Sequence, residues 1–560
     1  MATTTVSIGS RSNTVDTETP ASSSGSGPLY TVTFGTTPTG IAVGHIGTVA
    51  AFSWDDSSTS NYVYVVTAIS GDNITVKYLK DSESRGDASP YGLYSSGGSS
   101  GSPVQQVMVF KRSGITTAQA SASAPSYTVT FGDAGPPADL HVGDVGGGTD
   151  ESSGSEYTYL VTAIDLSNKT VTMKYVHDDG GNGTTSPHGL QGDDGNQLII
   201  DFNRAFSTIT LFEEMIDDSS PNYWGSSDDV VGELHADSNF TDATVNFSQK
   251  QSLSSVTLSV YEDDRHDGTA ESGALWKPTA NSGHDQGILR INIDDMTAEW
   301  LDISFDSLDS NDTNKGIVLV GTNNNNIIRN NLIHDKGGNP GNNGPFMIHA
   351  LAAGASSDSL YIFNNIIYNI VETSNDSASA VNINSWAGNA YIYNNTVYNI
   401  QGQGSGKHGI GFRFGNPSSS NTRIKNNIAS KCEGDNNRAY WKNSSGSTVD
   451  SANNLSDDTT DAAYNAEDMG QSLNDSSALI GKTLAQIDFV STSPGSEDLH
   501  LDASSVCLEA GVDLGTTNNV NIDIDGIDRD ATGVTWDIGA DQRSTAGAAT
   551  GSPAFILFMD

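Results

Sequence analysis

Short strands with alternating apolar and polar positions recur through the second half of the chain. Five of them contain a pair of asparagines, in the contexts IIRNNLI, YIFNNIIYNI, YIYNNTVYNI, RIKNNIA and DSANNL. The pairs are separated by 34, 30, 32 and 27 residues. The alternation is a β period, and a nearly constant interval of this length is typical of a solenoid. Asparagine suits a tight corner because it tolerates left-handed backbone. The pattern therefore predicts a parallel β-helix with stacked asparagine corners, whose ladder comprises Asn330, Asn331, Asn364, Asn365, Asn394, Asn395, Asn426 and Asn427.

A second set of strands precedes these corners. Its members begin at intervals of 29, 29, 34, 30 and 30 residues, at Gly287, Gly316, Pro345, Ser379, Gly409 and Ala439. A β-sandwich with asparagine-rich turns is the alternative, but it gives no reason for the same corner residues to repeat. We expect at least five coils between residues 285 and 460.

The segments that flank the repeats carry a resemblance. NRAFSTITLFEE (203–214) and DDRHDGTAESGA (263–274) precede the coils, and NIDIDGIDRD (521–530) and WDIGADQ (536–542) follow them. With these segments, residues 200–545 resemble the right-handed parallel β-helix repeat proteins of bacteria and phages, the pectate-lyase-like fold group. The resemblance implies an architecture and leaves function open, because such solenoids serve as lyases, hydrolases, adhesins and phage spikes.

The first part of the chain contains a duplication. YTVTFG occurs at Tyr30 and Tyr127, the segment 64–79 matches 159–176, and SPYGL matches SPHGL, at offsets of 97, 95 and 97 residues. Both copies alternate like strands and have polar turns. We expect an all-β chain with two tandem small β-sandwich or barrel modules ahead of the β-helix. The expected boundaries are an extended arm (1–28), module 1 (29–115), a linker (116–126), module 2 (127–203), the β-helix with its closing segment (204–545) and a flexible tail (546–560).

Composition restricts the partners. The chain has 68 acidic and 26 basic side chains, a net charge of −42. This charge argues against nucleic acid and anionic membranes, and disfavours polyanionic glycans without bridging cations. Cys432 and Cys507 are too few for a disulfide framework. The start, MATTTVSIGS, lacks the features of a secretory signal, and no stretch reaches membrane-spanning length. We therefore expect retention in the cytoplasm or release by a route such as virion assembly and lysis, with removal of a signal as the alternative.

Alternate residues of the second strand set would point to opposite faces of a sheet, and one of these two groups is polar. Ile317, Ile348, Val381, Ile410 and Tyr440 would point inward. The other phase would present a glycan-binding face made of His349, Asn382, Asn384, Arg413, Trp441 and Asn443. A solvent-facing sheet is polar in any case, so a purely structural interpretation remains open.

No catalytic residue can be assigned from sequence. His334 and Asp335 are a candidate base and orienting group, or a solvated corner. Glycoside hydrolysis needs a pair of carboxylates, but the sequence does not show which two of the candidates would form it: Asp335, Glu372, Glu433 and Asp435. No phosphate-binding loop, nucleophile elbow or zinc set is present in the sequence.

Two C-terminal segments are candidates for binding. Asn521, Asp523 and Asp525 resemble the start of a calcium loop, but Thr532 replaces the glutamate that would end it, so we expect a structural role and no cofactor. The last residues form an apolar peptide that either docks on a partner or folds back on its own domain, with the side chains Phe555, Ile556, Leu557, Phe558 and Met559.

These features favour a structural protein of a virion surface, such as a phage spike, fibre or head-decoration protein. Its partners would be other virion proteins, copies of itself and surface polysaccharide. A polysaccharide lyase, hydrolase or phage depolymerase on the same β-helix is the first alternative. A secreted, extracellular bacterial adhesin is the second.

Overall fold

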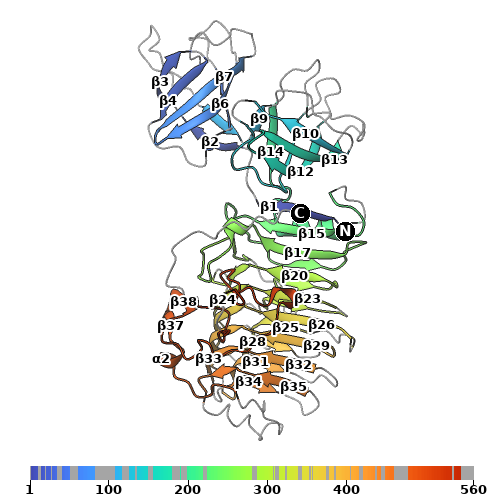
Figure 1. Ribbon diagram of the computed structural model, residues 1–560, viewed down its shortest axis with the longest axis vertical. Helices are drawn as coiled ribbons and strands as arrows, with labels where there is room; N and C mark the ends of the chain where they lie inside the picture. The colour runs from blue at the N-terminus through green and yellow to red at the C-terminus, as the bar shows by residue number, and fades with distance from the viewer. Residues whose placement is uncertain are drawn as a thin grey trace. The chain divides into compact units, whose positions relative to one another are not determined.

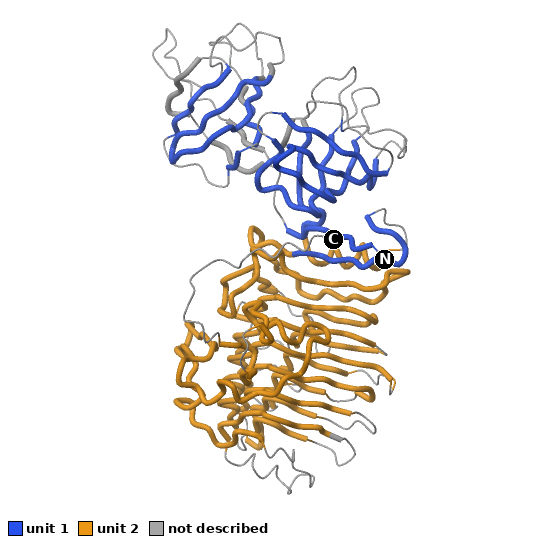
Figure 2. The backbone as a smooth tube through the Cα atoms, in the orientation of Figure 1, with its two compact units in different colours: residues 1–207, 220–233 blue, residues 208–219, 234–560 orange. Residues whose placement is uncertain are grey.

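The computed structural model describes residues 2–9, 14–18, 20–26, 28–34, 41–43, 45–50, 61–81, 108–111, 113–115, 125–132, 135–148, 156–178, 190, 199–218, 223–279, 287–306, 308, 315–321, 324–338, 344–351, 355, 357–373, 377–383, 386–403, 405–414, 421–434, 438–442, 448–458, 477–531 and 535–543. The chain forms two compact units (Figure 2). Unit 1 comprises residues 1–207 and 220–233, and unit 2 comprises residues 208–219 and 234–560.

Unit 2 is a parallel β-solenoid in which each coil adds one strand to each of three sheets (Figure 1). Sheet 1 is seven-stranded: β16 (Val245–Phe247), β19 (Leu289–Ile291), β22 (Ile317–Leu319), β25 (Phe346–Ala350), β28 (Ala378–Ile383), β31 (Gly409–Phe414) and β34 (Arg438–Lys442). In unit 2, sheet 2 contains β17 (Ser255–Val260), β20 (Met296–Glu299), β23 (Asn326–Arg329), β26 (Ser359–Phe363), β29 (Asn389–Tyr393), β32 (Asn421–Lys425) and β35 (Thr448–Ala452). Sheet 3 contains β18 (Leu275–Trp276), β21 (Asp302–Ser304), β24 (Leu332–Lys336), β27 (Ile366–Glu372), β30 (Thr396–Gly402), β33 (Ile428–Glu433) and β36 (Leu455–Ser456).

Neighbouring strands of these sheets pair in parallel from coil to coil. The predicted parallel solenoid is therefore confirmed. In chain order each coil passes through sheet 1, sheet 2 and sheet 3, and the asparagine pairs form the corner between sheets 2 and 3.

The two asparagines of each corner have different roles. The first has positive φ, between 52° and 58° from Asn330 to Asn453, a conformation that asparagine adopts at low cost. The second points into the solenoid, where side-chain amides bond from coil to coil: Asn331 to Asn365, Asn365 to Asn395 and Asn395 to Asn427 at 2.9 Å, and Asn427 to Asn454 at 3.0 Å. Only the second asparagine of each pair therefore belongs to the internal ladder, whereas the sequence predicted that both would.

The first asparagine of each corner points outward and holds the closing segment. Asn364 and Asn394 donate to the carbonyl of Val520 at 3.2 and 3.3 Å. Asn426 donates to the carbonyl of Val512 at 2.8 Å and accepts its N–H at 2.9 Å. The corners thus fix both the interior of the solenoid and the chain that returns along its side.

The closing segment covers sheet 3. It contains α2 (Leu484–Ile487), the antiparallel hairpin of β37 (Phe489–Ser493) and β38 (Ser496–Leu501), and the short helix η4 (Thr517–Asn519). Figure 1 shows the hairpin and α2 beside the strands of sheet 3. Apolar residues of sheet 3 and of this segment share one buried cluster that includes Leu332, Ile366, Ile428, Leu455, Ile487, Leu499, Ile524 and Ile538. The first residues of these strands are therefore buried on both faces of sheet 3, as in the consecutive pairs Leu332–Ile333 and Ile366–Ile367.

A helix packs on the first coil. In α1 (Ile209–Asp217) the buried residues Ile209, Phe212 and Ile216 lie on one face. Thr208 caps the helix by accepting the N–H of Leu211 at 3.1 Å. Phe212 packs against Phe247 of β16 with ring centroids 5.9 Å apart. The lead-in segment thus supplies apolar cover for the core at its N-terminal end.

Unit 1 contains two antiparallel sheets with matching strand order. In the first, the order is β3 (Pro20–Ser26), β4 (Leu29–Phe34), β7 (Asn73–Asp81), β6 (Asn61–Ser70), β5 (Ile46–Ala50), β8 (Met108–Lys111) and β2 (Thr14–Glu18). In the second, it is β10 (Ser126–Thr130), β13 (Thr170–Asp178), β12 (Tyr157–Asp165), β11 (Val145–Gly147), β14 (Ile199–Asn203) and β9 (Ser113–Ile115). From β4 and β10 onward the strands correspond one to one.

The two copies also share an irregularity. The long hairpins shift register between Val66 and Ala68 in one copy and between Val161 and Ala163 in the other. At the skipped position Thr67 donates to the carbonyl of Thr75 at 3.1 Å, and Thr162 donates to that of Thr172 at 3.2 Å. The duplication seen in the sequence is therefore a duplication of topology.

The expected extended arm (1–28) is instead paired. β2 and β3 lie at opposite edges of the first sheet. β1 (Thr3–Ile8) lies beside β15 (Asp229–Leu234), and Ser7 bonds to Asp144 of the second copy at 2.7 Å. β9, placed at the end of module 1 by sequence, belongs to the second sheet. The Ser/Thr-rich composition resembles that of a linker, but threonine also suits an edge strand.

Candidate functional site

Four residues of the predicted glycan-binding face lie in one row on sheet 1. The strand register aligns His349 with Asn382, Asn382 with Arg413, and Arg413 with Trp441. Asn384 and Asn443 lie outside the described residues. The adjacent row runs Ile317, Ile348, Val381, Phe412 and Tyr440. The sequence assigned Ile410 to this row, but β31 begins at Gly409 opposite Ala378, so Phe412 takes the place instead.

This row is less exposed than the sequence suggested. His349 and Asn382 are 2% and 1% exposed, whereas Arg413 and Trp441 are half-buried. The Arg413 guanidinium lies 5.9 Å from the ring centroid of Phe346 on β25 and 4.6 Å from that of Trp441 on β34. Because β28 lies between β25 and β31, the Arg413 side chain reaches across the strand that carries Asn382. The accessible part of the row is therefore its Arg413–Trp441 end.

Three groups with basic character surround the Trp441 indole. Arg413 lies 4.6 Å and Arg438 lies 5.2 Å from the ring centroid. The His408 ring meets the indole edge-on, with centroids 5.7 Å apart and planes at 64°. We call Arg413, Arg438, His408 and Trp441 the Trp441 cluster. Sequence reasoning missed Arg438 and His408, since Arg438 opens its strand and His408 lies just before β31.

Two polar atoms beside this cluster have no partner in the described part of the chain. The buried Nε1 of Trp441 has no hydrogen-bond acceptor, and the buried Oδ1 of Asn382 has no donor. Buried polar atoms in native proteins are nearly always satisfied, and the exceptions often mark a site for water, an ion or a ligand. The Trp441 cluster is therefore the strongest candidate for a binding site on the solenoid.

His334 forms a buried ion-paired group on sheet 3. Its Nε2 lies 2.8 Å from Asp302 Oδ1 and its Nδ1 lies 2.7 Å from Asp335 Oδ2, and its ring stacks on Tyr368 at 5.1 Å. Burial disfavours the charged ring, but these two carboxylates outweigh it and raise the pKa of His334 to about 9. At neutral pH His334 is a paired imidazolium, so the geometry gives it a structural role instead of that of a general base. Of the other candidate acids, Glu372 is buried, Glu433 is exposed and Asp435 lies outside the described residues.

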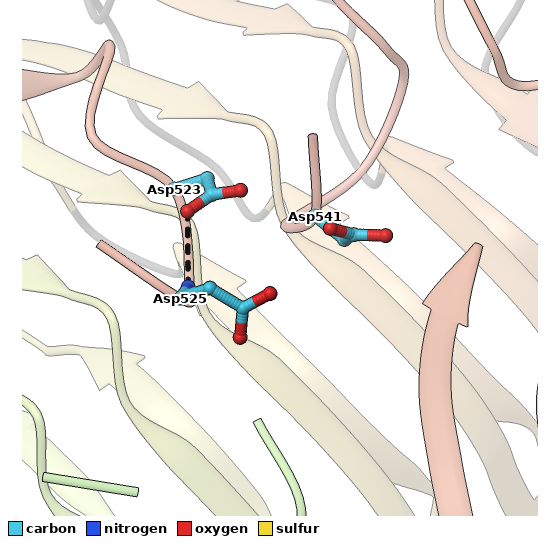
Figure 3. Close-up of side chains that lie close together, drawn as sticks. All are labelled: Asp523, Asp525 and Asp541. Atoms are coloured by element: carbon cyan, nitrogen blue, oxygen red, sulfur yellow. Dashed lines mark hydrogen bonds between the residues drawn. The ribbon is translucent and has the colours of Figure 1, made fainter. Parts of the chain in front are cut away.

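Three carboxylates meet in the closing segment. Oxygen atoms of Asp523, Asp525 and Asp541 lie within 4.8 Å of one another (Figure 3). Asn521, the remaining residue of the calcium candidate, instead donates to Asp528 at 2.8 Å. Asp541 was missed because it follows in the separate WDIGADQ segment.

Backbone N–H groups and nearby cations stabilise these carboxylates. Asp523 accepts the N–H groups of Asp525, Ile527 and Gln542 at 3.0, 2.7 and 2.9 Å. Asp541 accepts the N–H of Leu501 at 2.8 Å. Burial raises the pKa of Asp523 to about 8, although the buried Arg529 guanidinium favours its charged form. These contacts make the cluster a clamp that shapes the closing segment.

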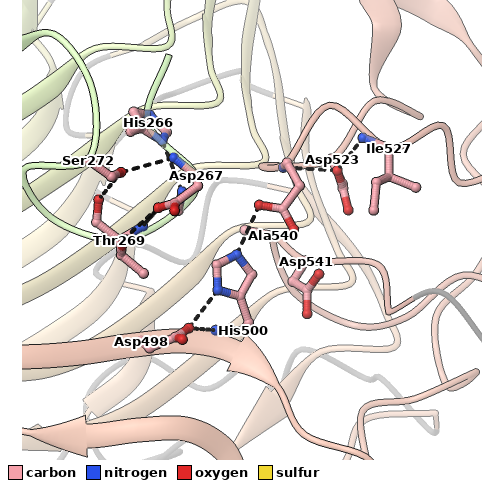
Figure 4. Close-up of polar contacts among 12 residues, drawn as sticks. His266, Asp267, Thr269, Ser272, Asp498, His500, Asp523, Ile527, Ala540 and Asp541 are labelled. Atoms are coloured by element: carbon pink, nitrogen blue, oxygen red, sulfur yellow. Dashed lines mark hydrogen bonds and ion pairs between the residues drawn. The ribbon is translucent and has the colours of Figure 1, made fainter. Parts of the chain in front are cut away.

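His500 of the closing segment lies against the turn that precedes the coils (Figure 4). Its Nδ1 lies 2.6 Å from Asp498 and its Nε2 lies 3.0 Å from Asp525. Burial opposes the charge, but the two carboxylates raise the pKa of His500 to about 11. A Cβ at Gly268 would lie 2.5 Å from the His500 ring. The turn before the coils therefore needs glycine where it meets the closing segment.

Comparisons with known proteins add no further assignment. No protein-family model, no curated protein and no solved structure matches this chain. Among the described residues, no helix is both long and apolar enough to cross a bilayer. Fold and site together define the class: an all-β protein with tandem antiparallel modules and a parallel β-solenoid.

Proposed function

We propose that this protein is a structural component of a virion surface, such as a phage spike, fibre or head-decoration protein. The proposal rests on one observation: two modules with the same strand order are combined with a solenoid whose coils are bonded to one another along its length. The internal ladder and the closing segment fix each coil to its neighbours, which suits a rigid projecting element. Tandem copies of one small module suit repeated attachment or spacing.

Assembly requires specific docking surfaces. Copies of a chain with a net charge of −42 repel one another, so association depends on local contacts. The C-terminal peptide from Phe555 to Met559 lies outside the described residues, and its five large apolar side chains are a candidate contact. Its proposed partners are other virion proteins or copies of this chain.

Localisation tests the proposal. Particles from a culture that carries the gene are purified on a density gradient, and their proteins are quantified by mass spectrometry and located by immunogold microscopy. The expected result is this chain in the particle band in fixed ratio to the major structural proteins, with label on the outer surface. Recovery only outside the particles, on cells or in the medium, would refute the virion role and favour a secreted adhesin.

A polysaccharide lyase, hydrolase or depolymerase is the second candidate. The Trp441 cluster favours it, because a basic and aromatic site on an outer sheet of the solenoid suits a sugar chain. The discriminating assay incubates the purified chain with bacterial capsule polysaccharides and measures newly formed reducing ends and chain length. Turnover that is lost in Arg413→Gln would replace the structural proposal with the enzymatic one.

A further inference from the structure

The outer face of sheet 2 carries a row of partly exposed apolar side chains. The strand register aligns Ile327 with Tyr361, Tyr361 with Tyr391, and Tyr391 with Arg423. The two tyrosine rings stack with centroids 4.7 Å apart and planes at 7°. The Arg423 guanidinium lies 4.8 Å from the centroid of the Tyr391 ring. All four residues are partly exposed, and we call them the Tyr391 row.

The closing segment already covers the neighbouring row of this face. Phe363, two positions after Tyr361 on β26, is buried with Val520 and Trp536 of the closing segment. Ile327 and Tyr361 pack against the margin of that buried cluster. The Tyr391 row is therefore the partly exposed edge of an apolar surface on which the chain docks one of its own segments. A continuous apolar surface of this kind marks a place for a further contact.

Arg423 gives the row a charged end. Asp450 lies opposite Arg423 in the register, but its carboxylate pairs with Lys425 Nζ at 2.9 Å. In the described part of the chain, the Arg423 guanidinium stacks on Tyr391 and makes no ion pair. An apolar row that ends in such a cation matches an apolar peptide that ends in a carboxylate.

The chain contains a peptide of this composition after the closing segment. Residues 554–560 read AFILFMD, in which five large apolar side chains precede Asp560. Ten residues, 544–553, connect this peptide to Arg543, the last of the described residues. A linker of ten residues spans at most roughly 35 Å when fully extended, so the peptide has the reach to bind a neighbouring copy.

We propose that the Tyr391 row receives the peptide 554–560 of a second copy of this chain. Its apolar side chains lie along Ile327, Tyr361 and Tyr391, and Asp560 pairs with Arg423. The inference rests on the proposed function, in which copies associate through this peptide, and it names the surface that receives the peptide. Docking within one copy would occupy both surfaces and leave neither for association. The contact is apolar with one attractive ion pair, which suits a chain whose net charge of −42 makes copies repel.

The first measurement locates the contact by photocrosslinking in the full chain. A benzophenone amino acid replaces Phe558, and the protein is prepared in a light form and a form labelled with heavy nitrogen. The two forms are mixed in equal amounts at low concentration, concentrated, irradiated and digested, and mass spectrometry identifies the crosslinked peptides. We expect crosslinks to the strands that contain Tyr361 and Tyr391, including pairs that join one light and one heavy peptide.

The second measurement follows association of the full chain by sedimentation velocity. Tyr361→Ser with Tyr391→Ser should weaken association at least about 10-fold, because tyrosines are often the dominant residues of an interface. Arg423→Glu should weaken it about 5-fold, and Asp560→Arg added to Arg423→Glu should restore it to within about 2-fold, because the exchanged charges attract again. Arg423→Glu keeps both tyrosines, so it tests the contact even where the double tyrosine variant does not fold.

The matched control removes an apolar side chain elsewhere on the solenoid. Val490 of β37 is 53% exposed, and Val490→Ser should associate like the wild type. Circular dichroism and thermal unfolding verify that each variant is folded.

Four results would overturn the proposal: no association of the wild type, crosslinks to other parts of the chain, crosslinks only between peptides of the same isotope, or unchanged association in Arg423→Glu. Same-isotope crosslinks alone would show that the peptide folds back on its own copy. All of these measurements use the purified chain, whereas the virion role is tested on particles. A chain found in particles without these crosslinks would keep the virion role and lose this contact, so the two failures are distinguishable.

Discussion

Replacing Asn395 by leucine tests the ladder most directly. The Asn395 amide donates to the carbonyls of Ile362 and Tyr393 at 3.0 Å and to Asn427 Oδ1 at 2.9 Å. Its Oδ1 accepts the backbone N–H of Asn365 at 3.1 Å and the side-chain amide of Asn365 at 2.9 Å. Four of these five bonds are buried and the bond to Tyr393 is partly buried, so water cannot reach most of the groups that lose their partners.

The expected loss in the free energy of unfolding comes from the polar groups that lose their hydrogen-bond partners. Leucine has nearly the same shape, so the loss is electrostatic more than steric. The backbone N–H of Asn365 loses the acceptor that it has in the ladder, and a buried donor without an acceptor costs about 1–3 kcal/mol. The lost bonds to Ile362 and Tyr393 add to it. We expect Asn395→Leu to lower the free energy of unfolding by about 2–4 kcal/mol.

The assay is guanidinium unfolding of the full chain, followed by tryptophan fluorescence and far-UV circular dichroism. A shifted midpoint with an unchanged slope reports lost stability and not an altered end state. Asn421→Leu is the matched control, because Asn421 is exposed and, among the described residues, its side chain makes a single 3.4 Å hydrogen bond, to Asn389. It should change stability by less than about 0.5 kcal/mol. Equal effects of the two substitutions would refute the energetic role of the ladder.

The remaining predictions concern charge, the closing segment and assembly. The pKa values of His334 and His500 are raised to about 9 and about 11. The stability that these imidazolium groups contribute is complete below the unfolded pKa of about 6.5 and is lost as the pH rises through the folded values, so the thermal midpoint should fall from neutral toward alkaline pH. A midpoint that rises over this range would contradict the two ion-paired sites. Arg529→Met should cost about 3–5 kcal/mol in the same unfolding assay, because the buried guanidinium bonds the carbonyls of Gly539 and Ala540 at 2.9 and 2.8 Å. Arg543→Met, at an exposed ion pair with Asp502, should cost less than about 1 kcal/mol and serves as its control. Deleting residues 553–560 should leave a folded chain that no longer assembles in sedimentation experiments, and normal assembly of that truncation would rule out the docking role of the apolar peptide.

The repeat was predictable because its corners use a residue type with a specific backbone requirement. Positive φ at Asn330, Asn364 and Asn394 selects asparagine at each turn, so the period is visible in the sequence. The different roles of the two asparagines in each pair were not predictable. The sequence does not distinguish the two asparagines of a pair. The outer asparagine finds its hydrogen-bond partners only in the closing segment, which returns along the solenoid.

The closing segment itself illustrates why burial was hard to anticipate. Leu332 and Ile333 are neighbours on opposite faces of sheet 3, and both are fully buried. A strand with one buried face has buried and exposed residues in alternation, whereas β24 begins with two consecutive buried apolar residues. The sequence gives no sign of what covers the outer face, because the covering residues come more than a hundred positions later.

The candidate site was predictable as a row but not as a cluster. Alternation places His349, Asn382 and Arg413 on one face, and the strand register agrees. It does not show that a long arginine side chain covers its neighbours, or that Arg438 and His408 converge on Trp441. These contacts depend on side-chain reach across coils, which a period along the chain does not encode.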